Sequence, residues 1–180
     1  VIARRGGTSA RSASAYQVNA TPTLTLTSPS EEGSADDFAT TWLNNPWDMS
    51  FLPDGRMFFT ERPGPVKLRL TNGTINTIVT PADVAPAGEA GMMGIAVDPG
   101  YASNNFIYAC YTAGSDNRVV RYHVNATQNG TDASTVLVQG LSKANFHDGC
   151  RVRFGPDGKL WVTTGDGGVG THPQNLDSVN

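Results

Sequence analysis

Apolar and polar positions alternate along much of the chain with the two-residue period of β-strands. Leu and Thr alternate over Thr21–Ser28 (TPTLTLTS), which predicts a half-buried strand. Further strands are expected over residues 66–70, 75–79, 118–124 and 134–138. No stretch of ten or more residues carries the 3.6-residue period of an amphipathic helix. The pattern therefore predicts an all-β fold.

One phrase recurs three times: an apolar strand, a turn with Pro and Gly, and an aromatic-rich strand. The copies are FLPDGRMFFT (residues 51–60), VDPG followed by NFIYAC (97–110), and FGPDGKLWVT (154–163). Because Pro presets φ and Gly supplies a positive φ, each phrase predicts a strand–turn–strand unit. Two further strands follow each of the first two copies. Four antiparallel strands per about 50 residues is the spacing of a β-propeller blade.

These signals divide the chain into a leading part and a partial propeller. Residues 1–20 form a Ser/Ala/Arg-rich tail, and residues 21–45 a leading strand and linker. Blades are expected over 46–81 and 88–140, with half a blade over 145–180. Propellers close a ring of about four to eight blades, whereas this chain holds about two and a half. The ring is therefore expected to be open, or completed by missing sequence or by a partner.

Composition excludes several classes of function. Thirteen Lys and Arg against 16 Asp and Glu give a net charge of −3, so the chain lacks the basic footprint of a nucleic-acid-binding protein. The longest apolar run, residues 92–97, is far too short to cross a bilayer. We expect no nucleic-acid partner and no membrane span.

Four Asn-X-Ser/Thr sequences, more than chance is expected to give, indicate an extracellular, glycosylated protein. They begin at Asn19, Asn72, Asn125 and Asn129. In that setting Cys110 and Cys150 are candidates for a disulfide that closes a loop of about 40 residues. Two buried free thiols are the alternative.

Several polar residues fall on loops that a propeller gathers at one end of its blades. These loops enter a blade or join its second and third strands, and they carry Arg62, Glu89, His147 and Asp166. A His beside carboxylates and an Arg at a channel mouth has the composition of a general-base site. Plainer alternatives exist: His147 and Asp166 would serve tight turns. Glu61 and Arg62 would form an exposed ion pair of little energy.

Three separated segments carry a more specific pattern. They are PWDMSFLPDGR with TERPG (residues 46–64), GMMGIAVDP (91–99), and HDGCRVRFGPDGKL with TTGD (147–166). In this order they resemble the soluble glucose/sorbosone dehydrogenase family, whose members are six-bladed β-propellers. That family uses pyrroloquinoline quinone, usually with calcium, to oxidise sugars. The resemblance implies the N-terminal part of such a propeller, a sugar substrate and both cofactors.

The resemblance also implies roles for individual residues. His147 falls on the catalytic base, which takes the proton of the sugar C1 hydroxyl as hydride passes to the quinone. Glu89 falls where the glucose-oxidising branch has a cofactor-contacting Gln, and Gln174 corresponds to a Gln that lines the sugar site. The chain has Phe146 where that branch has Asp, and Cys150 where the family usually has Gly. The residues that grip the quinone and the calcium ligands belong to later blades.

Two functions follow. The first is the N-terminal part of an extracellular quinone-dependent sugar dehydrogenase, completed by missing C-terminal blades or neighbouring subunits. The alternative is a non-catalytic structural glycoprotein with dehydrogenase-like blades, since a fold does not carry function with it. Its unpaired strand edges would join copies or other chains into an extracellular filament.

Overall fold

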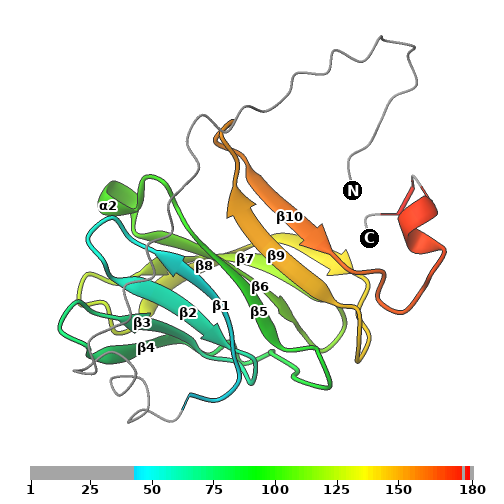
Figure 1. The fold of residues 1–180 in the computed structure, drawn as a ribbon, viewed down its shortest axis with the longest axis horizontal. Helices are drawn as coiled ribbons and strands as arrows, with labels where there is room; N and C mark the ends of the chain where they lie inside the picture. The colour runs from blue at the N-terminus through cyan, green and yellow to red at the C-terminus, as the bar shows by residue number, and fades with distance from the viewer. Residues whose placement is uncertain (1–42, 176, 179–180) are drawn as a thin grey trace, which may run out of the picture. The chain divides into compact units, whose positions relative to one another are not determined.

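The computed structural model describes residues 43–175 with 177 and 178, which form three antiparallel sheets (Figure 1). The first contains β1 (Pro46–Phe51), β2 (Met57–Glu61), β3 (Val66–Arg69) and β4 (Ile75–Val79). The second contains β5 (Met92–Val97), β6 (Phe106–Thr112), β7 (Asn117–Val124) and β8 (Thr131–Leu141). The third pairs β9 (Gly149–Phe154) with β10 (Leu160–Thr164). The all-β prediction is confirmed; the tail, the strand expected over Thr21–Ser28 and Asn19 lie outside the described residues.

The recurring phrase folds as a hairpin in the first and third sheets. In the first, the N–H of Leu52 donates to the Arg56 carbonyl at 2.8 Å. In the third, the N–H of Gly155 donates to the Lys159 carbonyl at 2.9 Å. The second copy differs, because its longer connection accommodates the single turn α2 (Tyr101–Asn104) between β5 and β6.

Two apolar layers hold the sheets together. The larger layer joins the first two sheets through side chains that include Phe58, Leu68, Ile95 and Ile107. The smaller layer joins the second sheet to β9 and includes Met93, Val119 and Val152. Burial of these side chains is the main force that stacks successive sheets.

A disulfide lies within the smaller layer. It joins Cys110 on β6 to Cys150 on β9, whose Cα atoms are 6.1 Å apart. Both cysteines are buried. The bond therefore fastens the second sheet to the third at their interface.

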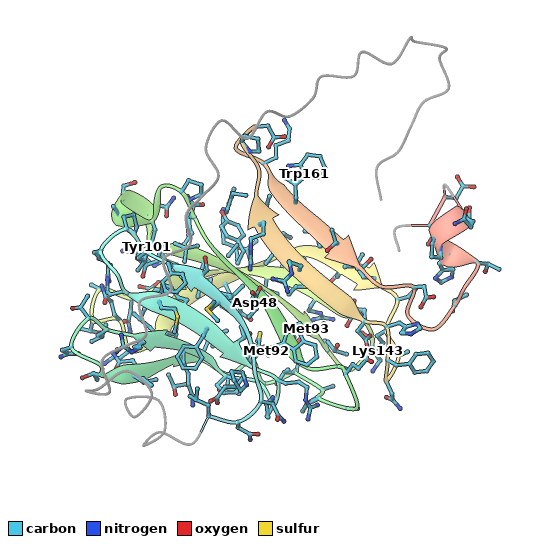
Figure 2. All side chains as sticks on the ribbon, viewed as in Figure 1. Asp48, Met92, Met93, Tyr101, Lys143 and Trp161 are labelled. Atoms are coloured by element: carbon cyan, nitrogen blue, oxygen red, sulfur yellow. A yellow bond between two sulfur atoms is a disulfide. The ribbon has the colours of Figure 1, made fainter. Side chains whose placement is uncertain are left out.

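The first strands of the three sheets lie next to one another, and a buried carboxylate links them (Figure 2). Asp48 on β1 accepts from both terminal nitrogens of Arg153 on β9, at 2.7 and 3.0 Å. It also accepts from the N–H of Ile95 on β5 at 3.1 Å. Gly94 allows this close packing, since a Cβ there would lie 2.7 Å from the carbonyl oxygen of Cys150.

We expect Asp48→Asn to lower the free energy of unfolding by about 2–3 kcal/mol, because a bidentate, charge-assisted pair is lost from a buried site. Urea unfolding followed by tryptophan fluorescence measures the change. Asp54→Asn is the matched control, since Asp54 forms an exposed ion pair with Arg56 and its loss should change stability little. Equal stability of Asp48→Asn and the natural protein would show that the three-strand link is energetically neutral.

The order of the strands brings one set of loops to a common end. β1 runs toward the turn at 52–56, and β2 returns, so the β2–β3 loop lies at the end where β1 begins. The same alternation applies in the second and third sheets. The segments that precede β5 and β9, and the segment that follows β10, therefore belong to this end.

Candidate functional site

His147 lies directly before β9, at the common end of the three sheets, and its main chain is tightly held. Its φ is 58°, in the left-handed region that few non-glycine residues adopt. Its N–H donates to Oε2 of Glu89 at 2.8 Å, and its carbonyl accepts from the N–H of Gly167 at 3.1 Å. The imidazole itself is 61% exposed. A fixed backbone thus presents a side chain that solutes can reach.

Asp166 is the partner of this imidazole. Its Oδ1 lies 3.1 Å from Nδ1 of His147 and accepts from the N–H of Gly168 at 2.8 Å. The Gly168 N–H, with a further contribution from His147, holds the pKa of Asp166 below its ordinary value. Because an ionised carboxylate only accepts hydrogen bonds, the hydrogen of this contact belongs to Nδ1 of His147.

Gly165 allows the loop after β10, which carries Asp166, to approach the loop before β9, which carries His147. A Cβ at this position would lie 1.9 Å from the carbonyl oxygen of His147, which is impossible without moving the backbone. The N–H of Gly165 also donates to the Asp148 carbonyl at 3.3 Å. A glycine directly before Asp166 is therefore what lets the carboxylate approach the imidazole.

Glu89 and Arg62 hold the neighbouring loop. The N–H of Glu89 donates to the Asn145 carbonyl at 2.9 Å, while its carboxylate accepts from His147, so two hydrogen bonds join this loop to the one before β9. Nη1 of Arg62 donates to the Ala90 carbonyl at 3.2 Å. The Arg62 carbonyl accepts from the N–H of Met92 at 2.9 Å. Arg62 thus positions the segment that carries Glu89.

The expectation that Glu61 and Arg62 form an exposed ion pair is wrong. Glu61 is buried and its Oε2 lies 2.8 Å from Nζ of Lys67, while its Oε1 accepts from the N–H of Asn44. Glu61 is the last residue of β2, a strand whose residues are all buried. Arg62 comes after the strand, and its side chain donates to the Ala90 carbonyl instead.

The sequence did not predict the buried hydrogen-bond network that holds the residue after His147. Asp148 is fully buried, and its Oδ1 accepts from Nδ2 of Asn117 and from the N–H of Ala144, both at 2.9 Å. Asn117 also donates to the Ser142 carbonyl at 2.7 Å. This network closes the loop before β9 onto the start of β7. Nothing in the local pattern around Asn117 signals the contact, because the two partners are 31 residues apart.

Gln174 and Phe146 differ in their relation to the His147–Asp166 pair. Gln174 lies in the short 3₁₀ turn η1 (His172–Gln174), and no hydrogen bond within the described part of the chain joins it to His147 or Asp166. Phe146 is 49% exposed, and its ring centroid lies 4.9 Å from that of His147 at an interplanar angle of 80°. The structure therefore gathers Arg62, Glu89, His147 and Asp166, but not Gln174.

The three described sequons occupy turns. Asn72 is exposed between β3 and β4, and Asn129 is exposed between β7 and β8. Asn125, in the same turn as Asn129, is half-buried and donates from Nδ2 to Oδ1 of Asn129 at 3.1 Å. Among the three, Asn72 and Asn129 are the more accessible to a modifying enzyme.

The described residues contain no group of three or more His, Cys, Asp or Glu side chains that could hold a metal ion. They also contain no helix long and apolar enough to cross a membrane.

Comparisons with known proteins agree with this geometry. The structure of the aldose sugar dehydrogenase from Streptomyces coelicolor in its PQQ-bound form is 32% identical, with a TM-score of 0.73. The match covers 78% of this chain and 43% of that one. A Thermus thermophilus structure described as a putative oxidoreductase (glucose dehydrogenase) is 34% identical, with a TM-score of 0.70, over 77% of this chain and 42% of that one. The two four-stranded sheets and the two-stranded third sheet are thus of the β-propeller type, as the repeat predicted.

Sequence comparisons give the same relationship. Quinoprotein glucose dehydrogenase B of Acinetobacter calcoaceticus is 27% identical over 140 residues, which is 70% of this chain and 29% of that protein. The chain spans less than half the length of each of these relatives. The family model described as Glucose / Sorbosone dehydrogenase matches residues 43–180, and the chain belongs to that family.

Proposed function

We propose that this chain supplies the proton-accepting part of the active site of a quinone-dependent sugar dehydrogenase. The observation that carries the proposal is the His147–Asp166 pair, in which the carboxylate orients an imidazole that is 61% exposed. Imidazole is the side chain that enzymes use most often as a general base. Relatives that match this chain are described as sugar or glucose dehydrogenases.

The described residues have distinct tasks in this mechanism. Nε2 of His147 removes the proton of the C1 hydroxyl of the sugar, and Asp166 stabilises the imidazolium that forms. The hydrogen bonds from Glu89 and Gly167 keep the base in place during the transfer. A quinone cofactor, when bound, supplies the two-electron acceptor for the hydride that leaves C1.

The positive charge of Arg62, at the common end of the sheets, suits a carboxylate of such a cofactor. Pyrroloquinoline quinone carries carboxylates, and the guanidinium of Arg62 is the type of donor that binds them. The carboxylate of Glu89 is occupied by the His147 N–H. We place the other cations that grip the quinone, and the calcium ligands, on blades beyond the described residues.

Reconstitution tests the proposal. The protein is taken from its natural source, so that any blades beyond this chain are present. It is mixed with pyrroloquinoline quinone and calcium, bound quinone is measured by absorbance after gel filtration, and reduction of a dye is followed with a panel of aldoses. Retained quinone and sugar-dependent dye reduction are expected. Failure to retain the quinone, or retention without oxidation of any aldose, would overturn the assignment.

We further propose that the protein is extracellular and carries glycans on Asn72 and Asn129. The exposure of both side chains in polar turns supports this, as does the buried Cys110–Cys150 disulfide, a bond typical of secreted proteins. Treatment of the protein from its natural source with an endoglycosidase should lower its mass by at least two glycans. An unchanged mass would contradict the proposal.

A structural role is the second candidate, and exposed apolar side chains favour it. Trp161 projects from β10 and is 58% exposed (Figure 2), and Trp47, Met49 and Phe51 are exposed along β1. Paired patches of this kind at the first and last sheets can join copies head to tail. Sedimentation velocity at native concentration distinguishes the two functions, since a monomer with dehydrogenase activity would exclude the assembly.

A further inference from the structure

Phe146 is an exposed aromatic side chain that contacts the imidazole of the proposed base. Its ring is set edge-on to the imidazole of His147, with centroids 4.9 Å apart. Single exposed apolar residues are common on protein surfaces and need no special explanation. The position of this one is different, because its ring contacts the imidazole that is proposed to accept the proton.

Contacts on several sides hold the ring of Phe146 in position. The residues on either side are tied to Glu89, by the Asn145 carbonyl at 2.9 Å and by the His147 N–H at 2.8 Å. The far edge of the ring lies over Gly168, where a Cβ would come within 3.1 Å of Cζ of Phe146. Gly168 belongs to the turn that also holds Asp166. The aromatic surface is therefore fixed relative to both members of the proton-accepting pair.

We propose that Phe146 is a substrate-positioning residue that stacks against the face of a pyranose that carries C2–H and C4–H, which leaves C1–H on the other face free for transfer. This inference rests on the proposed function. A pyranose presents axial C–H bonds on its ring faces and hydroxyls at its rim, and aromatic rings bind such faces while the rim remains hydrogen-bonded. With one face on Phe146, the C1 hydroxyl at the rim can reach Nε2 of His147.

Kinetics of the quinone-loaded protein test the role. We expect Phe146→Leu to raise KM for a neutral aldose about fivefold, since an aromatic contact is lost, while kcat changes less than about twofold. Phe146→Tyr, which keeps the ring, should restore KM. Phe51→Leu is the matched control: Phe51 is 64% exposed but lies at the other end of β1, so its KM should equal that of the natural protein.

A binding measurement separates this inference from the proposed function. Methyl β-D-glucopyranoside has no free C1 hydroxyl and cannot be oxidised there, yet it keeps the ring face. Saturation-transfer NMR should show its ring protons in contact with the natural protein and with Phe146→Tyr, and weaker contact with Phe146→Leu. If no sugar is oxidised by the natural protein, the proposed function fails. If oxidation is normal but KM and glucoside contact are unchanged in Phe146→Leu, this inference alone is wrong.

Discussion

Replacement of His147 by Asn is expected to lower kcat of quinone-linked sugar oxidation by about 10²–10⁴-fold, the usual contribution of a general base. Asn is chosen because it tolerates the left-handed backbone found at this position. Its amide has no basic nitrogen, so the proton of the C1 hydroxyl has no acceptor in this chain's site. The thermal midpoint should stay within a few degrees, because the imidazole is mostly exposed and contributes little to the core.

The matched control for this variant is His123→Asn. His123 on β7 is also paired through Nδ1 with a carboxylate, that of Asp132 on β8, but it lies near the turn at the opposite end of the second sheet. It should retain the full kcat. Equal activities of His147→Asn and the natural protein would remove His147 from the mechanism, whereas equal losses in both variants would indicate a general effect of losing a His–Asp pair.

The sequence predicts the strands of this fold better than the contacts between its sheets. The Pro-Asp-Gly turns and the two-residue periodicity are local, and they place the hairpins at 51–60 and 154–163. The link between Asp48 and Arg153 spans 105 residues. No pattern within a strand distinguishes a carboxylate that bridges three strands from one that faces water.

The proximity of three candidate residues follows from a similarly local feature of the sequence. Glu89, His147 and Asp166 lie on loops whose common end follows from the alternation of antiparallel strands, so their meeting could be predicted without knowing any side-chain contact. The support by Asp148 and Asn117 depends on how the loop before β9 packs against β7. Likewise, Glu61 is buried because Lys67 on the neighbouring strand neutralises it, a pairing that composition alone does not reveal.

Loss of the disulfide is the second large effect that we expect. Cys110→Ala combined with Cys150→Ala should lower the free energy of unfolding by about 4 kcal/mol on the chain-entropy model, since the bond closes a loop of about 40 residues. That loop contains β7 and β8 and ends at the strand that follows the His147 segment. Denaturant unfolding with and without a thiol reductant measures the effect.

The design of this experiment separates the bond from the packing around it. Ala leaves no buried hydroxyl, whereas Ser at both positions would add unpaired polar groups to the smaller apolar layer. The natural protein unfolded with reductant should therefore lie close to the Ala pair, and the Ser pair below both. Reductant should leave the Ala pair unchanged, because no other cysteine is present in the chain. If reductant leaves the unfolding midpoint of the natural protein unchanged as well, the disulfide contributes nothing, and the apolar layer alone holds the third sheet on the second.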